Sequence, residues 1–334
     1  MIVSATKLMM DCSLAPFLVL FQKRHPTLTY AQALLYYVIR IITSYQIPLV
    51  RRLFHFFGQL QRLIYKPFHV VETQKVKGLW YGQPVMDNDM HTHVTVLYLH
   101  GGGFACGSAS TQSSVLIKPL VNALNDLQIA VRVFSLEYDL APEFQYPHQI
   151  NQAVDAYKWL LAQHYTNIVI MGDSAGGNLG LSLMQEIVRT QLPQPSGGIL
   201  LSPWVDLTIS KASYERNEFT DYLARSGVHT ARSAYVTEEN VEKASPGLQS
   251  MDGLAPLMVV YGGAEMLADE IAAMVENAKI ANVEVEEIFH PEMCHVYPAV
   301  LKNSDHASEA FEGMAKFIAG VAKPDDDFMI AKFA

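Results

Sequence analysis

Short apolar runs alternate with helix-like segments along most of this chain, and that alternation constrains its fold more than any other feature. The first run, Val94–Leu99, contains no charged residue, as expected of a strand buried on both faces. Similar runs recur at Ala130–Leu136, Ile168–Met171, Gly198–Leu201, Pro256–Tyr261 and Val283–Phe289. Segments with helical periodicity, such as Gln152–Leu161 and Leu179–Arg189, separate them. The pattern predicts an α/β fold with a mostly parallel central sheet and helices on both faces.

Departures from the alternation divide the chain into regions. Residues 1–66 have the pattern of amphipathic helices, and strand-like character begins at His69. Residues 204–254 are polar and interrupt the alternation, so we expect an insertion above the carboxyl ends of the strands. We therefore predict an N-terminal helical segment (1–66), a main domain built from residues 67–203 and 255–334, and an insertion at 204–254.

Composition limits the partners and the compartment. The formal net charge is −9 and no cluster of Lys and Arg forms a basic face, so nucleic acid is not an expected partner. The three cysteines, Cys12, Cys106 and Cys294, fit neither a disulfide framework nor a zinc site, which favours a reducing, cytoplasmic location. The apolar run at 13–21 is too short to span a bilayer, whereas peripheral membrane contact through residues 13–57 and a homodimer both remain open.

The strongest candidate for a reactive side chain is Ser174, at the centre of the sequence GDSAG (172–176). A predicted strand precedes this G-x-S-x-G pattern and a predicted helix follows it, which is the context of a nucleophile elbow. The two glycines remove side chains where backbones crowd, and the serine is presented at a helix N-terminus. The competing interpretation is a glycine-rich turn without chemistry. A phosphate-binding turn is disfavoured because the lysine of a P-loop is missing.

The sequence HGGGF (100–104) directly follows the first apolar run and is a candidate oxyanion hole. Acyl transfer places negative charge on the carbonyl oxygen, and backbone N–H groups aimed at that oxygen stabilise it. Consecutive glycines let a backbone approach the substrate closely. We predict Gly102, Gly103 and Ala175 as the three donors. Taken alone, the glycines would indicate only a flexible turn.

Twelve histidines compete for the role of general base. His295 follows the last predicted strand and is therefore expected at the same edge of the sheet as Ser174. His290 is the main alternative candidate for the base because it is closer to the end of the last predicted strand. His91 and His93 form a weak metal-like pair, but no matching carboxylate or cysteine cluster stands nearby, so we expect surface residues and no bound metal.

A carboxylate just past the strand Pro256–Tyr261 should orient the histidine and stabilise its protonated form. Glu265 is the first carboxylate there and is our predicted acid. Asp269 and Glu270 come later, and we expect them in the first turn of the next helix, where negative charge is favourable. The resulting chain order of serine, acid and histidine matches the order found in α/β-hydrolases.

Several stretches together resemble the hormone-sensitive-lipase branch of the α/β-hydrolases. They are HGGGF at 100–104, YDLAPE at 138–143, GDSAGG at 172–177, SPW at 202–204 and GAEMLADE at 263–270, with His295 in the histidine position. The resemblance runs from roughly residue 94 to 320. It implies an α/β-hydrolase fold, a cap made from the N-terminal helices and the insertion, and neither a metal nor an organic cofactor.

The sequence departs from that branch at two positions. Glu265 stands where the branch commonly has Asp, which affects the geometry of the acid loop. Val296 and Tyr297 follow the histidine where the branch usually has Gly-Phe, which alters the wall of the pocket.

We expect a serine carboxylesterase that acts on a small-molecule ester, with a short acyl group on a bulkier alcohol, through an acyl-enzyme. The alternatives are an amidase-type deacetylase of arylamides or a steryl-ester deacetylase, a non-catalytic ligand receptor on the same fold, and a lipid-binding protein anchored by residues 13–57. The receptors that resemble this branch lack the catalytic histidine, so the presence of His295 disfavours the receptor alternative. Residues 13–57 are expected either to pack as structural helices or to roof the pocket.

Overall fold

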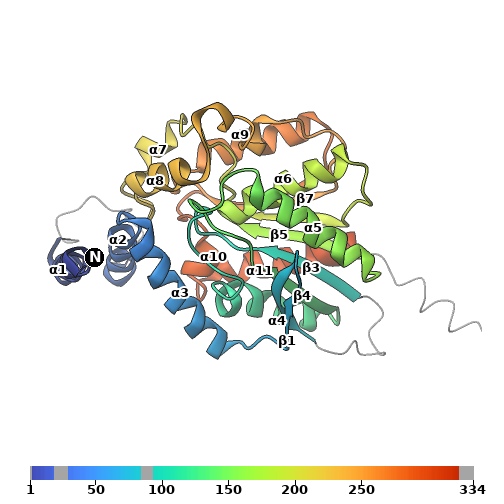
Figure 1. The fold of residues 1–334 in the computed structure, drawn as a ribbon, viewed down its shortest axis with the longest axis horizontal. Coiled ribbons are helices and arrows are strands. Elements are labelled where there is room, and N and C mark those ends of the chain that lie inside the picture. Colours follow the sequence, from blue (N-terminus) through green and yellow to red (C-terminus); the bar gives the residue numbers. More distant parts are fainter. Residues whose placement is uncertain (1, 19–28, 84–92, 323–334) are drawn as a thin grey trace, which may run out of the picture.

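The computed structural model describes residues 2–18, 29–83 and 93–322 of the chain (Figure 1). Residue 1 and residues 19–28, 84–92 and 323–334 lie outside the described residues, and so does His91 of the histidine pair.

A single mixed sheet forms the centre of the described structure. Its strands are β1 (His69–Glu72), β2 (Lys77–Gly82), β3 (His93–Leu99), β4 (Ala130–Leu136), β5 (Ile168–Asp173), β6 (Gly197–Leu201), β7 (Leu257–Gly262) and β8 (Val285–His290). They lie in the order β1-β2-β4-β3-β5-β6-β7-β8. β1 pairs with β2 and β2 with β4 in antiparallel fashion, whereas all pairs from β4 to β8 are parallel. The α/β fold with a mostly parallel sheet is therefore confirmed.

Helices cover both faces of the sheet (Figure 1). One layer contains α5 (His148–Ala162), α6 (Ala175–Arg189) and α9 (Ala268–Ile280); the other contains α4 (Lys118–Asp126), which follows η1 (Ser113–Ile117), together with α10 (Tyr297–Val300) and α11 (Asp305–Val321). The strand residues alternate between the two cores. In β3, Leu97 and Leu99 pack with the first layer, while Val96 and Tyr98 pack with the second. This period of two explains why the central strands read as unbroken apolar runs.

Two predicted strands begin later in the structure than expected. β7 begins at Leu257 rather than Pro256, because proline has no N–H to donate to a neighbouring strand. β8 begins at Val285 rather than Val283, whose N–H donates instead to Ala278 O at the end of α9 (3.0 Å). β8 is also the last strand of the sheet, and its exposed Glu286 and Glu287 reflect that edge position.

Three helices precede the sheet: α1 (Ile2–Leu18), α2 (Tyr30–Thr43) and α3 (Ile47–Ile64). Arg51 connects α3 to the main domain through two contacts. Its Nε donates a hydrogen bond to Ala105 O (2.9 Å), and its guanidinium forms an ion pair with Glu143 (2.8 Å). The outer side of α3 exposes a row of apolar side chains, namely Phe56, Phe57, Leu60, Leu63 and Ile64. Within the described ranges, no helix combines the length and apolar character that crossing a bilayer requires.

The segment at 204–254 contains α7 (Ser213–Arg216), α8 (Arg225–Tyr235), η2 (Glu238–Asn240) and η3 (Pro246–Leu248). It contacts the N-terminal helices: Arg40 Nε of α2 donates to Leu223 O (3.3 Å), and the rings of Tyr36 and Tyr222 meet edge to face with centroids 5.9 Å apart. Tyr235 at the end of α8 is fully buried and belongs to the main core. The insertion is thus packed into the main domain and joined to α2.

Candidate active site

Ser174 stands at the turn between β5 and α6, where the backbone is tight. Its φ of 54° and ψ of −121° are unusual for a residue with a side chain and indicate stored strain. A Cβ added to Gly172 would lie 2.2 Å from Gly176 O, and one added to Gly176 would lie 2.0 Å from Leu99 O. Only glycine fits both positions, so the spacing of the motif follows from the packing of α6 against β3 and β5.

Sheet register brings four loops distant in sequence to the same edge. Leu99 pairs with Gly172, so the loop after β3 and the turn after β5 leave the sheet side by side. Gly262 pairs with His290, and the loops after β7 and β8 carry Glu265 and His295. All of these loops follow the carboxyl ends of parallel strands.

Ser174, His295 and Glu265 form a continuous chain of close contacts. His295 Nε2 lies 2.9 Å from Ser174 Oγ, and His295 Nδ1 lies 3.1 Å from Glu265 Oε2. Both His295 and Glu265 are buried. With Nδ1–H donated to the carboxylate, Nε2 has its lone pair directed to the serine hydroxyl and can accept its proton.

Burial is the main influence on the pKa values of His295 and Glu265. It lowers the pKa of His295, an effect that the nearby charges of Asp221 and Asp173 oppose. Burial also raises the pKa of the Glu265 carboxyl, whereas hydrogen bonds from Ser202 and the Gly262 backbone act in the opposite direction. A histidine whose pKa lies below its ordinary value is neutral at pH 7, which is the form that accepts a proton.

Asp173, the residue before the serine, accepts a hydrogen bond from the glycine loop after β3. Gly101 N–H donates to Asp173 Oδ1 (2.9 Å), and the Tyr98 hydroxyl bonds to the same carboxyl. Gly102 and Gly103 have φ values of 118° and 62°, which favour glycine. Both line the cavity above Ser174, and within the described residues neither N–H makes a hydrogen bond. Ala175 is the first residue of α6.

The other histidines considered for the base lie elsewhere. His290 ends β8 and pairs with Glu309 at 3.4 Å, in a cluster separate from Ser174, His295 and Glu265. His93 begins β3 and is partly buried. His100 is fully buried, stacks on Tyr138 with centroids 4.1 Å apart, and burial lowers its pKa to about 4.

The two carboxylates that follow Glu265 have structural partners. Both lie in the first turn of α9, as expected. Asp269 is bound by Arg216 at 2.5 Å, and that ion pair lowers the pKa of its carboxyl. Glu270 is buried and accepts hydrogen bonds from Val205 N–H (2.9 Å) and the Tyr214 hydroxyl (2.9 Å). Neither is placed to contact His295.

Asp221 is a residue of this site that sequence reasoning missed. It is buried in the insertion, where Oδ1 accepts the His295 N–H (3.2 Å) and Oδ2 accepts the Met266 N–H (2.9 Å). Because Met266 directly follows Glu265, one carboxylate holds the backbones of both the histidine and its acid. No local pattern marks Asp221, since its partners come from two loops much later in the chain.

A cavity that is partly open to solvent lies over the serine. Its floor includes Gly102, Gly103, Ser174 and His295. Its walls come from α2, α3 and the insertion, and their apolar members include Ile39, Ile47, Val50, Phe54, Trp204, Leu223 and Val228. Both halves of the expected cap thus contact the space in which a substrate would sit.

Comparisons with known proteins agree with this architecture. Residues 96–299 match the family model described as the alpha/beta hydrolase fold. An esterase from Acinetobacter venetianus is 30% identical over 230 residues, which cover 66% of this chain and 73% of that protein. An acetyl-hydrolase from Streptomyces hygroscopicus is 32% identical over 208 residues, covering 61% of this chain and 68% of that protein.

Among solved structures, an esterase from the bacterial hormone-sensitive lipase family superimposes with a TM-score of 0.75. It is 27% identical, and the alignment covers 87% of this chain and 98% of that one. The chain therefore belongs to the α/β-hydrolase fold family. Within that fold it is an ester-hydrolysing enzyme of the hormone-sensitive-lipase branch.

Proposed function

We propose that this enzyme hydrolyses carboxylic esters with Ser174 as nucleophile, His295 as general base and Glu265 as the orienting acid. The observation that supports this assignment is the pair of short contacts at His295, 2.9 Å to Ser174 Oγ and 3.1 Å to Glu265 Oε2. Nucleophile, base and orienting carboxylate within hydrogen-bond reach are what acyl transfer by a serine requires.

In the first half of the reaction, Ser174 Oγ attacks the acyl carbon while its proton moves to His295 Nε2. The carbonyl oxygen becomes an oxyanion, which the N–H groups of Gly102, Gly103 and Ala175 stabilise. The ester C–O bond then breaks, and the alcohol leaves with the proton from His295. Water then gives a proton to the same nitrogen and attacks the acyl carbon. The bond between that carbon and Ser174 Oγ breaks, His295 returns the proton to Oγ, and the carboxylic acid is released.

We infer that the preferred substrates have a short acyl group and a bulkier alcohol. The similar Streptomyces protein bears the name acetyl-hydrolase. The cavity over Ser174 has apolar walls from α2, α3 and α8, which suits an apolar alcohol group.

A series of p-nitrophenyl esters of increasing acyl length tests the acyl preference. We expect kcat/KM to be highest for acetate or butyrate and to fall with longer chains, and Ser174→Ala to be inactive on all of them. An activity that rises up to palmitate would contradict the short-acyl assignment. Nitroacetanilide in the same assay tests the deacetylase alternative, because amides have the poorer leaving group and depend more on protonation by His295.

A further inference from the structure

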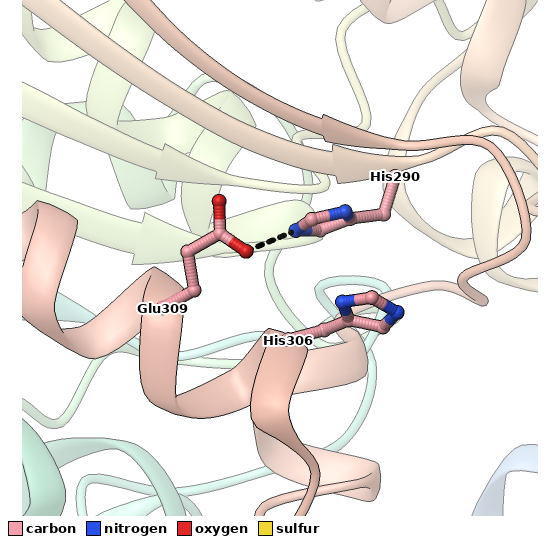
Figure 2. Close-up of side chains that lie close together, drawn as sticks. All are labelled: His290, His306 and Glu309. Carbon is pink, nitrogen blue, oxygen red and sulfur yellow. Dashed lines mark ion pairs between the residues drawn. The ribbon is translucent and has the colours of Figure 1, made fainter.

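Outside the active site, three metal-ligating side chains converge at one edge of the sheet. They are His290 at the end of β8, and His306 and Glu309 in the first turns of α11 (Figure 2). One ligating atom from each lies within 4.8 Å of the other two. We propose that these three residues bind a divalent transition-metal ion, zinc foremost, and that the ion fastens together both ends of the segment that carries His295.

One pair of these atoms already has the spacing of a zinc site. His290 Nε2 and Glu309 Oε2 are 3.4 Å apart. Tetrahedral zinc with bonds of 2.0–2.2 Å places neighbouring ligand atoms about 3.3–3.6 Å from each other. Nε2 of His290 is buried and, within the described residues, makes no hydrogen bond of good geometry. Such a covered nitrogen, beside a carboxylate oxygen, is suited to an ion between them.

His306 is oriented by a fourth residue in the way that metal-binding histidines usually are. Its Nε2 lies 3.2 Å from Glu292 Oε1. A proton held on Nε2 by that carboxylate leaves the lone pair of the ring on Nδ1, and one nitrogen of the ring faces His290 and Glu309 in Figure 2. The side chain is about one third exposed, so it can close the remaining distance without disturbing the core.

The chemistry of the donors selects the metal. Two imidazoles and one carboxylate favour zinc, nickel or copper over calcium and magnesium, which prefer sites built from oxygen alone. In the absence of metal, His290 contacts Glu309 and His306 contacts Glu292, and such partly exposed pairs contribute little to stability.

The position of the cluster gives the ion a structural effect on the proposed active site. His290 stands before His295 in the chain and His306 after it, so a shared ion closes the loop between β8 and α11. Binding to the folded protein alone stabilises it by mass action. This effect is independent of the ester chemistry and would hold whatever the substrate is.

Titration of zinc chloride into the full-length, chelator-treated protein tests the proposal by calorimetry and thermal unfolding. We expect one ion per chain and a rise in Tm of at least ~3 °C at saturation. His306→Ala and Glu309→Gln should each weaken binding by at least about tenfold and abolish the Tm shift, because each removes a ligand. Glu312→Gln is the matched control, since Glu312 is exposed on the same helix and pairs with Lys316.

Two results would overturn the proposal. If wild-type protein shows no saturable binding, the three side chains form ion pairs only. If His306→Ala and Glu309→Gln bind zinc as tightly as wild type, the ion is held elsewhere, for example by the half-buried thiol of Cys12. His306 is partly exposed and Glu309 largely so, so both variants are expected to fold, and circular dichroism verifies it.

Discussion

At the residue scale, three acidic side chains near the start of α9 are alike in chemistry and differ in surroundings. Glu265 is buried against His295, Asp269 is bound to Arg216, and Glu270 supports the backbone of the insertion. The proposed role in catalysis therefore belongs to Glu265 because of its contact, while the other two serve the attachment of the insertion to α9.

Exchange of each carboxylate for its amide separates these roles. Glu265→Gln should lower kcat by roughly 10³-fold or more, because the amide cannot stabilise the imidazolium that forms on His295. Asp269→Asn should change kcat by less than about threefold, since an exposed ion pair contributes little. Steady-state kinetics on p-nitrophenyl acetate measures both. A larger loss in Asp269→Asn would move the acid to that position.

The pH dependence of kcat/KM reports on His295. Only the neutral imidazole accepts the serine proton, so activity should rise with pH as His295 loses its proton. Burial lowers the pKa of His295, and the midpoint of this rise should therefore lie below the ordinary histidine value of about 6.5. His164→Asn, at an exposed turn, should leave the profile unchanged. A midpoint well above pH 7 would contradict the assignment of His295 as a buried base.

At the element scale, the elbow depends on close packing of α6 against the strands beneath it. A Cβ at Gly176 would lie 2.0 Å from Leu99 O, whereas a Cβ at Gly320 near the end of α11 meets nothing within 4 Å. Gly176→Ala should therefore lower the free energy of unfolding by at least ~2 kcal/mol, and Gly320→Ala should leave it unchanged or raise it by up to ~1 kcal/mol. Urea denaturation compares the two, and equal stabilities would show that α6 can move away from β3 at little cost.

Also at this scale, much of the architecture could be predicted because parallel strands impose order. Their carboxyl ends share one edge, so Ser174, Glu265 and His295 could be singled out by their positions after strands. Asp221 could not, because its hydrogen bonds reach across from the insertion to loops that only the folded chain brings near. The antiparallel pairing of β1 with β2 could not be predicted either, because the sequence after His69 shows only a general strand-like pattern.

At the scale of the whole molecule, the N-terminal helices and the insertion enclose the cavity over Ser174 together. Phe54 of α3 lines that cavity, whereas Phe56 on the same helix is 63% exposed. Deleting residues 1–57 would also remove Arg51, which fastens α3 to the loop after β3. Single substitutions in α3 therefore test the proposed roof more cleanly than truncation.

Phe54→Ala should raise KM for esters of bulky alcohols several-fold and change it little for ethyl acetate, because remote contacts contribute binding energy only to large substrates. Phe56→Ala should leave both values near wild type. Kinetics on the two substrates with the two variants checks this. Equal losses on small and bulky esters in Phe54→Ala would indicate that α3 supports the site without contacting the substrate.

The central claim is that Ser174 forms the acyl-enzyme, and the turnover of Ser174→Ala tests it most directly. With circular dichroism and Tm verifying the fold, we expect kcat on p-nitrophenyl acetate to fall by at least ~10⁴-fold, because among the described residues it is the Ser174 hydroxyl that hydrogen-bonds to His295 Nε2 (2.9 Å). Turnover within about tenfold of wild type by the folded variant would contradict the assignment of Ser174 as the nucleophile.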